Sequence, residues 1–126
     1  MYSGYKTCLL IDDNYIDNFV TRRILESSNF AEHIVVQQSA TDAIIAIKNG
    51  LKPDVIFLDL RMPLMNGFEF LQEYDKLKNH DKSSTKIFML SSSLDPVDVK
   101  RSGQNKYITQ FIHKPLTQKI LEELHA

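Results

Sequence analysis

The sequence predicts an α/β domain in which helices cover both faces of a parallel β-sheet. Short apolar runs recur along the chain, segments with helical periodicity separate them, and each run is continuous rather than alternating. Strands that alternate with helices favour a parallel sheet, and parallel strands buried on both faces are apolar throughout. The predicted strands are TCLLI (7–11), IVV (34–36), VIFL (55–58), IFML (87–90) and the weaker FI (111–112).

Five helices are expected between and after these runs. The first spans roughly 15–28, and helical spacing predicts an apolar face made of Ile16, Phe19, Val20, Ile24 and Leu25. The other four follow from periodicity and from cap and stop signals: one around 43–47 that stops at Asn49-Gly50, one over 68–78, one opened by Asp95-Pro96 and one that Thr117 can cap.

Size and charge limit the possible functions. The 126 residues fit one domain over 1–126, and 43% hydrophobic and 25% charged residues are ordinary for a globular protein. The net charge of −1 argues against a surface for nucleic acid or anionic membrane. No apolar run approaches the ~18 residues of a membrane span, and the N-terminus does not resemble a signal peptide.

Cysteine and histidine usage narrows the class further. Cys8 is the single cysteine and lies in an apolar run, which excludes an internal disulfide, predicts a core thiol and indicates a reducing cytoplasm. A zinc site is not expected because no metal-ligand spacing relates the four histidines, His33, His80, His113 and His125.

Polar residues follow the predicted strands at the edge where ligands bind in an open parallel sheet. Asp12 and Asp13 follow the first run, Asp59 the third, Ser91-Ser92-Ser93 the fourth, and Lys114-Pro115 comes just past the fifth. Only Gln37-Gln38-Ser39 follows the second, as expected for an edge strand away from the site. Carboxylates, hydroxyls and a lysine therefore gather at one edge.

This combination of groups indicates phosphoryl chemistry. Carboxylates this close raise each other's pKa unless a cation neutralises them. Mg²⁺ characteristically binds through one or two carboxylates together with phosphate and water. A lysine ammonium suits a carboxylate or phosphoryl oxygen, and a serine hydroxyl can donate to another. The pattern predicts a site for a phosphoryl group on or beside an aspartate.

Each of these residues also has a plainer interpretation. Asp59 is then a strand-end acid that caps a loop, Asp12-Asp13 is turn or helix-cap chemistry, and Lys114 is a surface lysine. Their shared position at the strand ends favours the functional interpretation.

Four motifs, LLIDD, VIFLDLRMPLMNGFEF, MLSSS and FIHKP, resemble the motif set of the receiver domain of two-component response regulators, in order and in spacing. The resemblance covers essentially the whole chain and includes the chemotaxis-type single-domain regulators. It implies a flavodoxin-like doubly wound fold, with five helices around a five-stranded parallel sheet of order 2-1-3-4-5.

The resemblance also implies roles for the strand-end residues. Asp59 would be the phosphoacceptor, and Mg²⁺, with Mn²⁺ or Ca²⁺ as substitutes, would be held by Asp12, Asp13, Asp59 and the backbone carbonyl of Arg61. Lys114 would neutralise Asp59 and later the phosphoryl group, with a cis peptide bond between Lys114 and Pro115.

The switch that the resemblance implies involves Ser91 and Phe111. Ser91 would move toward the added charge of the phosphoryl group, Phe111 would fill the vacated space, and the face of the fourth helix, fifth strand and fifth helix would change. Phe111 is equally interpretable as a core phenylalanine. Arg61 and Ser93 occupy positions that flank the path of the hydrolytic water in the family.

The expected function is a cytoplasmic response regulator receiver, which accepts a phosphoryl group from a sensor histidine kinase or phosphotransfer protein and is no enzyme beyond its own phosphorylation and dephosphorylation. A phosphorelay shuttle or a receiver excised from a longer regulator or kinase remains open, as does the downstream protein target. A Mg²⁺-dependent phosphohydrolase normally carries an acid/base aspartate where Arg61 stands. A binding module without phosphorylation would normally lack one of the acids or the lysine.

Overall fold

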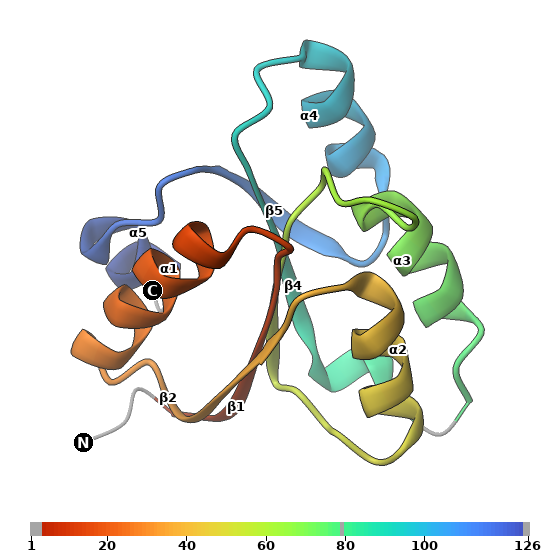
Figure 1. Cartoon of the computed structure of the whole chain (residues 1–126), viewed down its shortest axis with the longest axis horizontal. Helices are drawn as coiled ribbons and strands as arrows, with labels where there is room; N and C mark the ends of the chain where they lie inside the picture. The colour runs from red at the N-terminus through yellow and green to blue at the C-terminus, as the bar shows by residue number, and fades with distance from the viewer. Residues whose placement is uncertain (1–3, 79, 125–126) are drawn as a thin grey trace.

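A parallel sheet forms the centre of the molecule (Figure 1). The computed structural model describes residues 4–78 and 80–124, and within them five strands pair in the order β2-β1-β3-β4-β5. All pairs are parallel, so the predicted topology is confirmed. The strands are β1 (Tyr5–Ile11), β2 (Ala31–Gln37), β3 (Val55–Leu58), β4 (Lys86–Ser91) and β5 (Ile108–His113).

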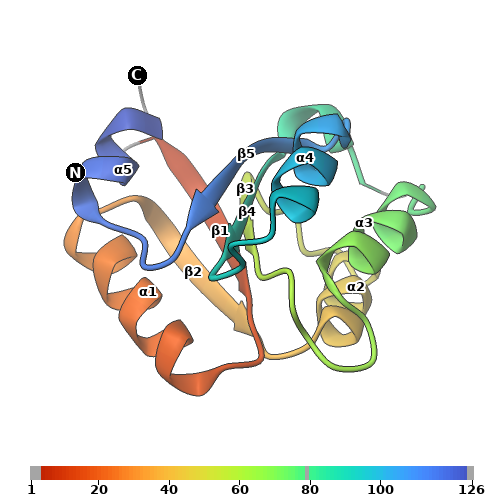
Figure 2. The ribbon, with the colours of Figure 1, turned by 90° about the horizontal axis from the view of Figure 1, so that it is seen from above.

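Helices cover both faces of the sheet, as the sequence predicts. Seen from above, α1 and α5 lie on one side, and α2, α3 and α4 lie on the other (Figure 2). The helices of the described residues are α1 (Tyr15–Ser27), α2 (Ala40–Lys48), α3 (Gly67–Asp75), α4 (Pro96–Gln104) and α5 (Gln118–Leu124), with a short 3₁₀ turn at Lys82–Ser84. No helix in these residues is both long and apolar enough to cross a membrane.

Two apolar clusters, one on each face, explain why the apolar runs are continuous. Successive residues of β3 point to opposite faces: Ile56 and Leu58 pack with α2 and α3, while Val55 and Phe57 pack with α1 and α5. All four have no exposed surface. The strand that leads to Asp59 is therefore the most deeply buried part of the sheet, and it provides a rigid support for that residue.

Cys8 is fully buried on β1, in the cluster that faces α1 and α5. Burial raises the pKa of its thiol far above the ordinary value. The prediction of a packed core thiol is confirmed.

The predicted apolar face of α1 is wrong in its first two turns. Ile16, Phe19 and Val20 are 69%, 58% and 42% exposed, whereas Asn18 and Thr21 face the interior. The physical reason is polar: the side-chain amide of Asn18 donates a 2.8 Å hydrogen bond to the backbone carbonyl of Asp12. This buried bond sets the rotation of the helix, and the large apolar residues turn outward as a result.

The third helix is shorter than predicted. It ends at Asp75 rather than at residue 78, because the next two backbone amides bond to carbonyls three residues back, Lys76 to Glu73 and Leu77 to Tyr74. This tighter pattern closes the last turn.

Candidate functional site

Strand register brings the predicted residues together. Ile11 of β1 pairs with Leu58 of β3, so Asp12 and Asp59 leave neighbouring strands at the same level. The amide of Asp59 donates to the carbonyl of Ile11 at 2.8 Å, which continues the ladder one residue beyond the strand. The expected gathering of carboxylates at the carboxyl edge of the sheet is present in the structure.

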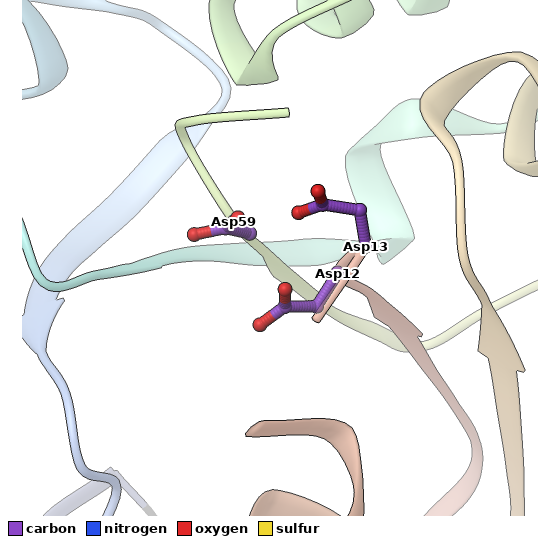
Figure 3. Close-up of side chains that lie close together, drawn as sticks. All are labelled: Asp12, Asp13 and Asp59. Atoms are coloured by element: carbon purple, nitrogen blue, oxygen red, sulfur yellow. The ribbon is translucent and has the colours of Figure 1, made fainter. Parts of the chain in front are cut away.

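Asp12, Asp13 and Asp59 form the acidic cluster of this edge (Figure 3). Each offers one carboxylate oxygen, and these atoms lie within 4.8 Å of one another. Asp12 and Asp59 are buried, whereas Asp13 is exposed. Close oxygen donors of this type are the ligands that a hard divalent cation such as Mg²⁺ prefers, so the residues fit such an ion.

Lys114 enters the same site from the segment after β5. Its ammonium nitrogen lies 2.8 Å from Asp12 Oδ2, 2.8 Å from Asp17 Oδ2 and 3.2 Å from Asp59 Oδ1. The peptide bond between Lys114 and Pro115 is cis, the geometry that the family resemblance implies. The lysine side chain is only 13% exposed, so the interpretation as an ordinary surface lysine is wrong.

Asp17 is a site residue that the strand-end pattern did not reveal. It stands in the first turn of α1, whose N-cap Asn14 accepts a hydrogen bond from the Asp17 amide. Asp17 follows no apolar run, so a pattern of polar residues at strand ends does not include it. The signal that could have found it is the cap itself, which places the first turn of α1 beside the end of β1.

The electrostatics of the site are dominated by crowded negative charge. Burial and the nearby carboxylate of Asp12 raise the pKa of Asp59 to about 6, against the lowering effect of Lys114. Burial on its own lowers the pKa of Lys114, but its hydrogen bonds to Asp12 and Asp17 raise it above the ordinary value. The lysine is therefore charged at neutral pH, and a further cation would favour the ionised form of Asp59.

Ser91, expected just after the fourth apolar run, is the last residue of β4, and Phe111 lies on β5 as predicted. Ser91 ends β4 and is 1% exposed, and its Oγ accepts a hydrogen bond from the Ser93 amide at 3.1 Å. That bond leaves the hydroxyl proton available to a new acceptor. Phe111 on β5 is half-buried and packs against the core cluster that includes α2 and α3. Its ring also contacts the ring of His113 edge-on, at a centroid distance of 5.1 Å.

A second charged cluster adjoins the site and was not predicted. Arg61 Nη2 lies 2.5 Å from Asp98 Oδ2, and Ser93 Oγ donates to the same oxygen at 2.6 Å. These bonds, that of Ser93 foremost, lower the pKa of Asp98 below its usual range. Asp98 stands in the first turn of α4, where an acidic residue ordinarily faces solvent, so its burial could not be predicted from the sequence.

Gly67 permits the close packing behind Asp59. Its amide donates to the carbonyl of Leu60 at 2.9 Å. A Cβ at this position would lie 2.8 Å from the backbone oxygen of Asp59 and 3.1 Å from the Cα of Leu60. The start of α3 can approach the end of β3 this closely only because the residue has no side chain.

Fold and site together define an α/β protein with a buried aspartate, an acidic cluster and a lysine at the carboxyl edge of its sheet. Residues 8–125 match the family model of the response regulator receiver domain. The chain belongs to this family, whose members act in two-component signalling.

Solved structures and curated relatives agree with this assignment. The chain superimposes on a two-component response regulator from Cytophaga hutchinsonii with a TM-score of 0.87 and 30% identity, covering 96% of this chain and 94% of that one. For a response regulator receiver protein from Dyadobacter fermentans the TM-score is 0.85 and the identity 33%, with 94% of each chain covered. An uncharacterized response regulatory protein of Vibrio cholerae is 31% identical over 94% of this chain.

The curated relatives are longer proteins. The chain spans 56% of the Vibrio cholerae protein, so the activity of that whole protein is not transferred to this chain.

Proposed function

We propose that Asp59 accepts a phosphoryl group from a phosphohistidine of a partner kinase or phosphotransfer protein. The observation that carries this proposal is the position of the Asp59 carboxylate, buried at a strand end with Lys114 at 3.2 Å and the carboxylates of Asp12 and Asp13 beside it. Family membership supports it, since receiver domains work with histidine kinases.

In the proposed reaction, an oxygen of Asp59 attacks phosphorus while the phosphorus–nitrogen bond to the imidazole breaks. The ring nitrogen leaves with the bonding electron pair, and the phosphoryl group remains on Asp59 as an acyl phosphate. Lys114, which already lies 3.2 Å from the Asp59 carboxylate, pairs with the phosphoryl group, and the Ser91 hydroxyl donates to one of its oxygens. Catalysis therefore consists mainly of positioning and charge neutralisation.

A divalent ion completes the charge balance of this proposal. Asp13, Asp59 and the backbone carbonyl of Arg61 would hold Mg²⁺ with Asp12 beside them, and the bound ion supplies the positive charge that the crowded carboxylates and the phosphoryl oxygens need. Mn²⁺ and Ca²⁺ are expected to substitute because they prefer the same oxygen donors.

The proposed output is a change of the surface formed by α4, β5 and α5. A phosphoryl group adds roughly −1.5 to −2 charges. Ser91 moves toward it, and Phe111 occupies the space released. A protein partner binds the altered surface. This holds whether the chain acts alone, as a phosphorelay shuttle or as part of a longer regulator.

The arginine two residues past Asp59 distinguishes this proposal from a phosphohydrolase. Its guanidinium is ion-paired with Asp98 and cannot serve as a general acid or base at neutral pH. A stable acyl phosphate, rather than turnover of phosphate esters, is therefore the expected product.

Phosphotransfer from candidate kinases and phosphotransfer proteins, with Mg²⁺ or with a chelator, tests the proposal. The wild type should acquire an acid-stable, hydroxylamine-sensitive label only with Mg²⁺, and Asp59→Asn should acquire none. Asp42→Asn, an exposed acid in the first turn of α2, is the matched control and should be labelled normally. Labelling of Asp59→Asn with the same chemical stability would refute the assignment.

A further inference from the structure

The cluster of Arg61, Ser93 and Asp98 connects three segments around the site. Arg61 belongs to the loop after β3, Ser93 to the loop after β4, and Asp98 to α4. Asp98 Oδ2 accepts from Arg61 Nη2 at 2.5 Å and from Ser93 Oγ at 2.6 Å. The position of α4 is thereby tied to both loops that carry site residues.

The two partners of this ion pair differ greatly in exposure. The side chain of Arg61 is 63% exposed, whereas that of Asp98 is 9% exposed. An exposed arginine in such a pair contributes little to stability and exchanges partners at little cost. The buried carboxylate, in contrast, needs its hydrogen bonds.

Asp98 keeps other partners when Arg61 leaves. Ser93 still donates to it, and the charge of Arg101 acts on it as well. The Arg101 guanidinium lies 4.1 Å from the centre of the Phe68 ring, which keeps it close to α3. The carboxylate of Asp98 therefore keeps a hydrogen-bond donor when Arg61 moves away.

Arg61 stands two residues past Asp59 and carries a side chain that suits phosphoryl oxygens through its planar set of donors. A phosphoryl group on Asp59 would bring more negative charge than Asp98 offers. The two anions then compete for one guanidinium.

We propose that Asp98 is a positioning residue that holds the Arg61 side chain on α4 in the unphosphorylated protein, and that Arg61 exchanges Asp98 for the phosphoryl group when Asp59 is phosphorylated. This inference rests on the proposed function of Asp59. The exchange releases the tie between α4 and the loop after β3, so the charge change at the site acts directly on α4.

Ser93 links this exchange to Ser91. The Ser93 amide donates to Ser91 Oγ, and the Ser93 hydroxyl donates to Asp98 and accepts from the Asp95 amide. Movement of Ser91 toward a phosphoryl group therefore displaces Ser93, which is also hydrogen-bonded to Asp98. Both effects of phosphorylation converge on the first turns of α4.

The test uses beryllofluoride with Mg²⁺, a phosphoryl mimic that coordinates a carboxylate oxygen, and measures its dissociation constant by titration. Asp98→Asn removes the competing charge and should bind the mimic about threefold to tenfold more tightly than the wild type. Asp95→Asn is the matched control, because it removes the same charge from the start of the same helix and retains the cap. It should bind like the wild type.

Arg61→Gln alters an exposed side chain and keeps the test valid if Asp98→Asn folds poorly. It should weaken binding of the mimic by about threefold to tenfold, and Asp98→Asn should have no further effect in its presence. A second measurement is the side-chain NMR resonance of Arg61, which should shift on binding of the mimic in the wild type.

Two results separate the inference from the proposed function. If the wild type binds the mimic but Arg61→Gln binds it equally well, or if Asp98→Asn behaves like Asp95→Asn, the exchange does not occur. If the wild type itself does not bind the mimic, the proposed function of Asp59 fails and the exchange fails with it.

Discussion

Two cations close to Asp59 are held in different ways. In the part of the chain that the structure describes, Lys114 pairs with three carboxylates and is 13% exposed, whereas Arg61 pairs with Asp98 alone and is 63% exposed. Burial strengthens each electrostatic contact and makes the loss of a partner costly, whereas water replaces a partner readily at the surface. Lys114 is therefore held firmly within the site, whereas Arg61 can give up its partner at little cost.

The largest expected effect is the loss of the buried cation. Lys114→Gln leaves the carboxylates of Asp12, Asp17 and Asp59 without their shared partner and should lower the free energy of unfolding by about 3 kcal/mol at neutral pH without Mg²⁺. Denaturant unfolding in a chelator measures it. Lys106→Gln, which removes an exposed lysine paired with Asp75, should leave stability unchanged. Equal effects of the two substitutions would contradict the comparison.

Asp59→Asn should raise the free energy of unfolding, in contrast to Lys114→Gln. Because the pKa of Asp59 is raised to about 6 in the folded protein, the folded state binds a proton more readily than the unfolded state, and ionisation of Asp59 destabilises the fold. The substitution should stabilise the metal-free protein by about 2 kcal/mol above pH 6. The gain should shrink as the pH falls from 6 and disappear below pH ~4.

Unfolding curves of both proteins in a chelator, between pH 4 and 8, measure this gain. Added Mg²⁺ should narrow the difference, since the ion stabilises the wild type. A gain that persists unchanged at low pH would show that crowding of negative charge is not its cause.

Asp17→Asn removes one of the three partners of Lys114 and should cost about 1 kcal/mol, since the Asp17 side chain is 40% exposed. The matched control is Asp42→Asn, because Asp42 occupies the same place after the N-cap of α2 as Asp17 does after that of α1. Thermal unfolding of the two variants compares them. If they lose the same stability, the effect belongs to the helix terminus and not to Lys114.

The smallest expected effect on stability is that of Arg61→Gln, about 0.5 kcal/mol, and it should fade in high salt. Denaturant unfolding at low and high ionic strength measures it. A loss as large as that of Lys114→Gln would show that Arg61 is as fixed as the lysine, and the exchange proposed above would then be untenable.

The residues around Lys114 and around Arg61 also show how much of this molecule can be predicted from its sequence. The fold was predictable because burial on both faces makes β1, β3 and β4 continuous apolar runs. Asp12 and Asp59 were predictable because they follow such runs, and Lys114 because it follows the weaker apolar run of β5. Asp17 and Asp98 were not, because helical residues reach the site through the rotation of their helix. That rotation depends on tertiary hydrogen bonds such as the one from Asn18 to Asp12.

The outward face of α1 illustrates the same limit. Periodicity groups Ile16, Phe19 and Val20 correctly on one side of the helix, but it cannot tell which side meets the sheet. In the structure Asn18 and Thr21 are on the buried side, and the Asn18 side-chain amide donates a hydrogen bond to the backbone carbonyl of Asp12.

Because Cys8 is buried, the folded protein should not react with thiol reagents. Its thiol is inaccessible and its raised pKa leaves almost no thiolate, and the sequence contains no tryptophan. A cysteine introduced at Val97, which is 67% exposed on α4, can therefore carry one fluorescent label at a defined position. Movement of α4 can therefore be followed by a label on that helix, without first replacing Cys8 and without tryptophan fluorescence from the protein.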